Sequence, residues 1–92
     1  MRPTQRTYTN VETKKTYRLF HDSNTGDLEL RTENEMQEIF NGAVYFCAFD
    51  SVTIRLNNDR IIPLRMGEFY ALKPGENVTH RKFAGFKQFR RV

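Results

Sequence analysis

Residues Ala43-Val-Tyr-Phe-Cys-Ala-Phe49 form an uninterrupted apolar run. Both of its alternating faces avoid water, one carrying Val44, Phe46 and Ala48 and the other Ala43, Tyr45, Cys47 and Phe49. A strand that is apolar on both faces belongs inside a sheet that is covered on both sides. The run is too short to cross a membrane, which takes about 20 residues. We therefore expect it to be the central strand of the fold.

A hairpin is predicted before this run. Residues Tyr17–His21 and Leu28–Arg31 alternate between apolar and polar side chains, and the turn-forming segment Asp22–Asp27 separates them. We expect the core-facing side chains to be Tyr17, Leu19, Leu28 and Leu30.

A short helix is predicted between the hairpin and the apolar run. Thr32-Glu33-Asn34-Glu35 has the pattern of a capping box, in which Thr32 and Glu35 satisfy each other's backbone N–H groups. Met36, Ile39 and Phe40 then recur at helical spacing, and Asn41-Gly42 is a typical helix end. A helix over Glu33–Asn41 would be marginal alone, so we expect it to pack on the sheet.

Further strands are predicted after the run. Apolar and polar side chains alternate over Val52–Leu56, which predicts a strand. Asn57–Asp59 is expected to form a tight turn, and Arg60–Leu64 to form the second strand of the hairpin. Pro63 has no N–H, so the returning strand is expected at an edge. Glu68–Leu72 is one more strand, and it stops before the turn at Pro74-Gly75.

The C-terminal stretch permits two interpretations. Phe83, Phe86 and Phe89 recur every third residue, which on a helix would form one stripe. Gly85 interrupts that pattern, and a strand broken at Gly85 is the alternative.

Taken together, these elements predict a single α+β domain over residues 1–92. We expect one small antiparallel sheet with one short helix on a face, in a ββαβββ-like order, followed by a C-terminal helix or strand. Residues 1–15 are expected to form a polar, basic N-terminal arm. Tyr8 and Val11 are its candidate anchors. The arm is expected either to be solvated, with at most a short edge strand, or to become ordered on an anionic partner.

Cysteine content and hydropathy limit the class of protein. Cys47 is the one cysteine, so an internal disulfide and a Cys-rich metal site are excluded, and its place in the apolar run predicts a buried, unreactive thiol. No apolar leader and no membrane span are visible. We expect a cytoplasmic protein that has no membrane partner; if phage-encoded, it would act in the host cytoplasm.

The charge pattern favours an anionic partner. The net charge is +4, the two ends of the chain are basic, and residues 33–50 carry four acidic groups and no basic one. Cations interleaved with Phe residues near the C-terminus are typical of contact with phosphates and bases. We expect RNA, DNA or a ribonucleoprotein complex as the partner, a solubilising basic surface being the alternative. The candidate binding residues are His80, Arg81, Lys82, Lys87, Arg90 and Arg91, with Arg55, Arg60 and Arg65 extending the patch and Arg2, Arg6, Lys14 and Lys15 on the arm.

Residues that could support catalysis are few. No metal-ligand spacing, phosphate-binding loop or activated nucleophile is recognisable, so no catalytic residue, metal or cofactor is expected. One enzymatic alternative is a small ribonuclease of the toxin type, with His80 or His21 as acid or base. Another alternative is a structural or assembly protein that pairs through a sheet edge.

The chain is expected to be a short α+β domain with separate acidic and basic patches and no catalytic motif. In these general features it resembles the small phage-encoded inhibitors of bacterial defence, the anti-CRISPR proteins among them. This resemblance implies a stoichiometric, non-enzymatic inhibitor. It implies that the stretch Arg81–Arg91 would dock where a nucleoprotein complex exposes RNA or expects DNA. The acidic segment Glu33–Glu38 would then meet a Lys- and Arg-rich protein surface. The resemblance assigns no role to individual residues.

Overall fold

The backbone forms nine β-strands and no helix within residues 1–34, 36–38, 40, 42–83 and 86–90, which are those that the computed structural model describes. Side chains are described as far as Thr79. The strands are β1 (Arg2–Asn10), β2 (Thr16–His21), β3 (Leu28–Arg31), β4 (Ala43–Cys47), β5 (Ser51–Leu56), β6 (Ile61–Arg65), β7 (Glu68–Ala71), β8 (Val78–Phe83) and β9 (Phe86–Arg90).

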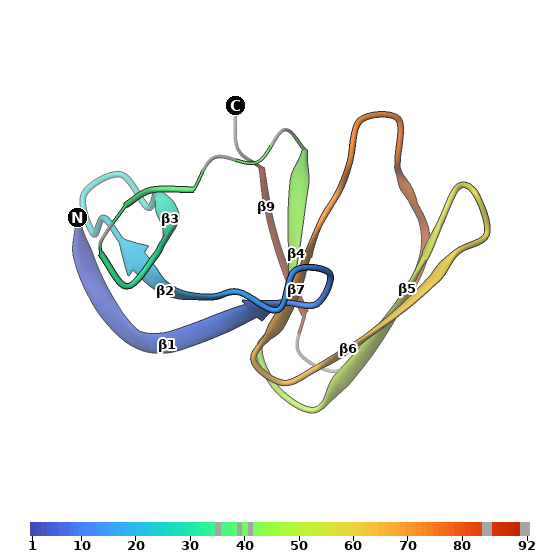
Figure 1. Ribbon diagram of the computed structural model, residues 1–92, viewed down its shortest axis with the longest axis horizontal. Helices are drawn as coiled ribbons and strands as arrows, with labels where there is room; N and C mark the ends of the chain where they lie inside the picture. Colours follow the sequence, from blue (N-terminus) through green and yellow to red (C-terminus); the bar gives the residue numbers. More distant parts are fainter. Residues whose placement is uncertain (35, 39, 41, 84–85, 91–92) are drawn as a thin grey trace.

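The strands are arranged in two sheets (Figure 1). The large sheet has the order β3-β2-β1-β7-β4-β9, and the small sheet has the order β6-β5-β8. All neighbours are antiparallel except β1 and β7, which are parallel. In three places the chain passes directly from one sheet to the other, namely from β4 to β5, from β6 to β7 and from β8 to β9. The order β7-β4-β9 in the large sheet therefore matches the order β6-β5-β8 in the small sheet.

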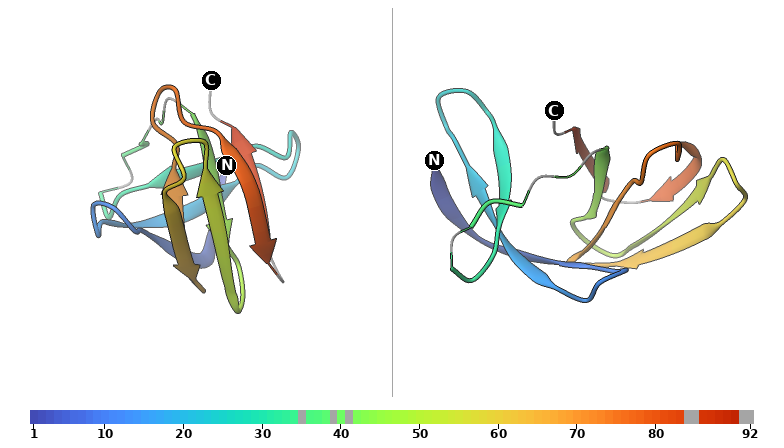
Figure 2. Two further views of the ribbon diagram at one scale, coloured as in Figure 1. Left: turned by 90° about the vertical axis from the view of Figure 1, so that its right-hand side faces the viewer. Right: turned by 45° about the horizontal axis from the view of Figure 1, so that its top comes forward.

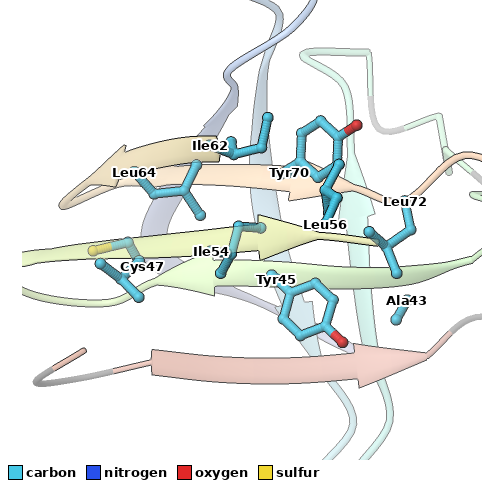
Figure 3. Packing of buried hydrophobic residues seen from close by; sticks show 10 residues of the cluster. Ala43, Tyr45, Cys47, Ile54, Leu56, Ile62, Leu64, Tyr70 and Leu72 are labelled. Atoms are coloured by element: carbon cyan, nitrogen blue, oxygen red, sulfur yellow. The ribbon is translucent and has the colours of Figure 1, made fainter. Parts of the chain in front are cut away.

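The central strand β4 is buried at every position, as its apolar sequence predicts. Ala43, Tyr45 and Cys47 pack against the inner side chains of the small sheet (Figure 3). Val44 and Phe46 belong to a second cluster on the other face of β4. The large sheet curves beyond β7, as Figure 2 shows, and its strands β1, β2 and β3 cover this second face.

The β2–β3 hairpin and its core-facing side chains are confirmed. Leu19 pairs with Leu30 in the ladder, and both side chains are buried. Tyr17 lies in the same cluster, and Leu28 packs against it. Gly26 closes the connecting loop with a φ of 79°, a conformation that glycine adopts without strain.

The β5–β6 hairpin is also confirmed. Its turn contains Asp59 with a φ of 68°, which suits an αL-tolerant residue. Pro63 lies in β6, an edge strand of the small sheet, where the missing N–H is tolerated.

The predicted helix over Glu33–Asn41 is wrong, and with it the α+β fold class, because the described part of the chain is all-β. The single small antiparallel sheet is also wrong, because the strands form two sheets and β1 pairs with β7 in parallel. The backbone after β3 instead folds back along the edge of that strand. The Glu38 N–H donates to the Leu30 carbonyl (3.0 Å), the Thr32 N–H donates to the Met36 carbonyl (2.9 Å), and Gln37 bridges Arg31.

The residues with helical spacing do not share one buried face, because contacts with distant parts of the chain decide where they pack. Met36 is 67% exposed, whereas the ring of Phe40 packs edge-on against Tyr17 and Phe69. An isolated helix of this length has little stability of its own, so a sheet edge and an aromatic cluster compete successfully for its backbone and side chains. Glu35, Ile39 and Asn41 of the predicted helix lie outside the described residues.

Both ends of the chain are built into the sheets. The basic N-terminal segment supplies β1, which pairs with β2 and β7, and its expected anchors Tyr8 and Val11 contact the core. The C-terminal stretch forms β8 and β9, so the strand alternative is confirmed and the helix alternative is wrong for the described residues.

Candidate nucleic-acid interface

The small sheet carries charge of one sign. Its three strands contain Arg55, Arg65, Arg81 and Lys82 but no Asp or Glu. Burial alternates along β5 and β6, so every second residue faces solvent. We call this solvent-facing surface of β6-β5-β8 the outer face; its described side chains are those of Ser51, Thr53, Arg55, Ile61, Pro63, Arg65 and Thr79.

The strand register arranges basic positions in successive rows across the outer face. Arg55 of β5 pairs with Ile61 on one side and with position His80 on the other. In the next row Thr53 pairs with Lys82, and in the third Ser51 pairs with Arg65. Successive rows lie roughly 6.6 Å apart along the strands. Arg81 pairs with Ile54 and so belongs to a row whose β5 member is buried.

The two described arginines of the outer face keep their full charge available. Arg55 and Arg65 are exposed, and their guanidinium groups have no ion pair or hydrogen bond among the residues that the structure describes. Arg60 is different, because its Nη2 lies 2.6 Å from Glu12 Oε1 and its guanidinium 5.9 Å from the Tyr70 ring centroid. Arg60 was predicted to extend the patch, but its charge is neutralised locally.

The remaining predicted binding residues lie elsewhere. Arg2 and Arg6 are in β1, and Lys14 and Lys15 are in the connection to β2. Lys87 and Arg90 are positions of β9, opposite Phe46 and Ala43 of the large sheet. Arg91 lies outside the described residues. The structure thus brings together Arg55, Arg65 and positions His80 and Lys82 of β8, and it separates the rest from them.

Two exposed apolar side chains border the outer face, and sequence reasoning missed both. Phe49 lies between β4 and β5 and is 49% exposed; Met66 lies between β6 and β7 and is 66% exposed. Phe49 was expected to be buried with the central run, but β4 ends at Cys47. The available signal was the bend at Asp50-Ser51, which directly follows Phe49.

The two histidines lie in different sheets. His21 ends β2 in the large sheet, and its side chain is exposed. His80 is a position of β8 in the small sheet. Among the described side chains, no cluster of three or more His, Cys, Asp or Glu could hold a metal ion.

A polar network joins three connecting segments beside the small sheet. The buried Tyr70 hydroxyl donates to Glu76 Oε1 at 2.8 Å, and the same carboxylate oxygen accepts the Lys73 N–H at 2.9 Å. Glu12 Oε1 lies near both Arg60 (2.6 Å) and the Lys73 ammonium (3.7 Å). Burial and the hydrogen bond to Glu76 raise the pKa of the Tyr70 phenol. The network is structural, since it is satisfied internally.

The Glu76 carboxyl responds to opposing influences. Burial acts to raise its pKa. The hydrogen bonds from the Lys73 N–H and the Tyr70 hydroxyl, with the positive charges of Lys73 and Arg60, outweigh that effect, so the pKa of Glu76 is lowered.

A shallow pocket lies apart from the outer face. It has a volume of about 460 Å³ and is lined by residues of β1, β2 and the segment after β3, namely Pro3, Thr7, Thr16, Tyr17, Arg18, Phe20, Thr32 and Glu33. Its one cation and one carboxylate give it no net preference for an anion.

No family model, curated protein or solved structure matches this chain. The part of the chain that the structure describes contains no helix long and apolar enough to cross a membrane.

Proposed function

We propose that this protein is a non-enzymatic nucleic-acid-binding protein and that the outer face is its contact surface. The observation that carries the proposal is the absence of acidic residues from the sequences of β5, β6 and β8, together with the guanidinium groups of Arg55 and Arg65, which have no ion pair with any side chain that the structure describes. Surface arginines on ordinary solvated faces are commonly interspersed with carboxylates, which lower their attraction for anions. A face of one sign attracts phosphate at long range and guides the encounter.

The proposal predicts a measurable salt dependence. If about three cations of this face neutralise phosphates, the slope of log affinity against log salt is about −2 on a single strand. Affinity then falls roughly 20-fold between 50 and 200 mM salt. Fluorescence anisotropy with a labelled oligonucleotide across a salt series gives both quantities.

Matched arginine substitutions distinguish binding by the outer face from attraction by the net charge of the protein. Arg55→Gln with Arg65→Gln is expected to reduce the slope by about 1.4, because two phosphate contacts are lost. Arg18→Gln is the control for each single change, since Arg18 is an exposed arginine in β2 of the large sheet. Equal effects of Arg18→Gln and Arg55→Gln would contradict the outer face as the binding surface.

A narrower form of the proposal is that the protein occludes a nucleoprotein complex in the cytoplasm, as phage anti-CRISPR-type inhibitors do. Pull-down of a defined ribonucleoprotein that survives nuclease would favour this form. Cleavage of the RNA probe, lost in His80→Ala or His21→Ala, would instead favour the ribonuclease alternative.

A further inference from the structure

Phe49 is unusual among the aromatic residues of this protein. Among the side chains that the structure describes, it is the one exposed aromatic ring; Phe40 is half-buried, and the other aromatic side chains are buried. With 49% of its surface in solvent, the ring contributes little to the core.

The corner that presents Phe49 is fixed by other groups. Asp50 has a φ of 61°, and the buried Cys47 Sγ lies 3.6 Å from the Phe49 carbonyl oxygen and 3.7 Å from that of Asp50. The Gly67 N–H donates to the Cys47 carbonyl (2.9 Å), which ties this corner to the adjacent one that holds Met66. The ring is therefore held on the surface by a rigid backbone without being needed to build it.

The charges around this corner are balanced, unlike those of the outer face. Arg6 Nη1 lies 3.5 Å from the Ala48 carbonyl oxygen, and the carboxylate of Asp50 in the corner offsets its charge. The Arg65 guanidinium belongs to the outer face, and it is the backbone N–H of Arg65 that donates to Glu68 Oε1, at 2.6 Å. A locally neutral, apolar site suits an uncharged base better than a phosphate.

We propose that Phe49 is a base-stacking platform and that the ligand of the outer face is therefore single-stranded nucleic acid. This inference rests on the proposed function and names its substrate class. In a duplex the bases already stack on one another, and a ring at a protein corner reaches them only after unstacking. An unpaired base is free to stack on an aromatic face, and such contacts tolerate any sequence.

The test compares one labelled strand with its duplex. The full chain is titrated against a fluorescein-labelled single-stranded RNA 12-mer, the same DNA strand, and the DNA duplex, at one salt concentration. We expect tighter binding to both single strands, and Phe49→Leu to weaken that binding by on the order of tenfold while binding to the duplex is unchanged. Met66→Leu is the matched control, because it keeps an apolar side chain in the neighbouring corner.

A second measurement locates the base directly. An oligonucleotide that contains 5-iodouracil is crosslinked by light, and the attached peptide is identified by mass spectrometry. A crosslink at Phe49 supports the inference, and crosslinks confined to other peptides overturn it.

The outcomes distinguish the inference from the function on which it rests. Equal binding of strand and duplex, with Phe49→Leu inert and Arg55→Gln still weakening, overturns the stacking platform and leaves the binding face intact. Absence of binding to any probe overturns both. Light scattering that shows a dimer lost in Phe49→Leu would assign this corner to self-association instead and overturn the platform.

Discussion

Phe46 and Phe49 are three residues apart in one apolar run, yet the structure predicts very different consequences for the same substitution. Phe46 is 2% exposed, and its ring centroid lies 4.6 Å from that of Tyr8 and 6.0 Å from that of Phe69. Replacing a buried Phe by Ala costs about 3–5 kcal/mol in lost transfer free energy and cavity. A chain of 92 residues has a free energy of unfolding of about 5–14 kcal/mol in total. Phe46→Ala is therefore expected to remove a large part of it.

Phe49→Ala is expected to cost about 1 kcal/mol at most, because about half of that side chain is already in water. Urea denaturation followed by far-ultraviolet circular dichroism measures both variants. Phe46→Ala should lower the denaturation midpoint by about 1–3 M, and Phe49→Ala by much less. Phe46→Leu provides a milder variant should Phe46→Ala not fold. Equal costs for the two alanine variants would refute the burial of β4 on both faces.

Three further predictions follow from the polar network, the thiol and a glycine. The pKa of Glu76 is lowered in the folded state, so the ionised carboxylate stabilises the fold fully above the ordinary pKa of 4.5. This stabilisation is lost as the pH falls through the folded pKa, and Glu76→Gln should therefore make the urea midpoint depend less on pH in that acidic range. Cys47 is 0% exposed, and burial raises the pKa of its thiol; a thiol reagent should label it in urea but not in the native protein. Gly67 has a φ of 83°, so Gly67→Ala should cost about 1–2 kcal/mol and lower the melting temperature by about 5–15 °C.

Local pattern was sufficient for part of this fold. Period-two alternation predicted β2, β3 and β5, and a run that was apolar on both faces identified β4 as the covered central strand. Turn chemistry placed the β2–β3 and β5–β6 connections, and Pro63 indicated the edge position of β6. These features depend on neighbours in sequence, which is why sequence reasoning reaches them.

The features that sequence reasoning missed depend on distant contacts. Met36 and Phe40 have helical spacing, but only the aromatic partners of Phe40 on β2 and β7 decide where its ring packs. The pairing of β1 with β7 likewise joins segments that no local pattern relates.

The candidate site was predictable in part for the same reason. The sequence identifies Arg55, Arg65, His80 and Lys82 as candidate binding residues, but it identifies Arg60 in the same way. The ion pair between Arg60 and Glu12 could not be predicted, because Glu12 is distant in sequence. The sequence predicts that Phe49 is a core residue, and its exposure follows only once β4 is known to end at Cys47.

The parallel pairing of β1 with β7 has a consequence for the synthesis of the chain. It joins Thr9 to Glu68 and Asn10 to Phe69, so β1 cannot complete this pairing until β7 has been made. A ribosome adds about 5–20 residues per second from the N-terminus onward. The β1–β2–β3 unit can assemble early, but its apolar surface gains cover only when β4 and β7 emerge. Until β7 has been made, the nascent domain therefore carries an uncovered apolar surface, and it closes as a whole only after that strand has emerged.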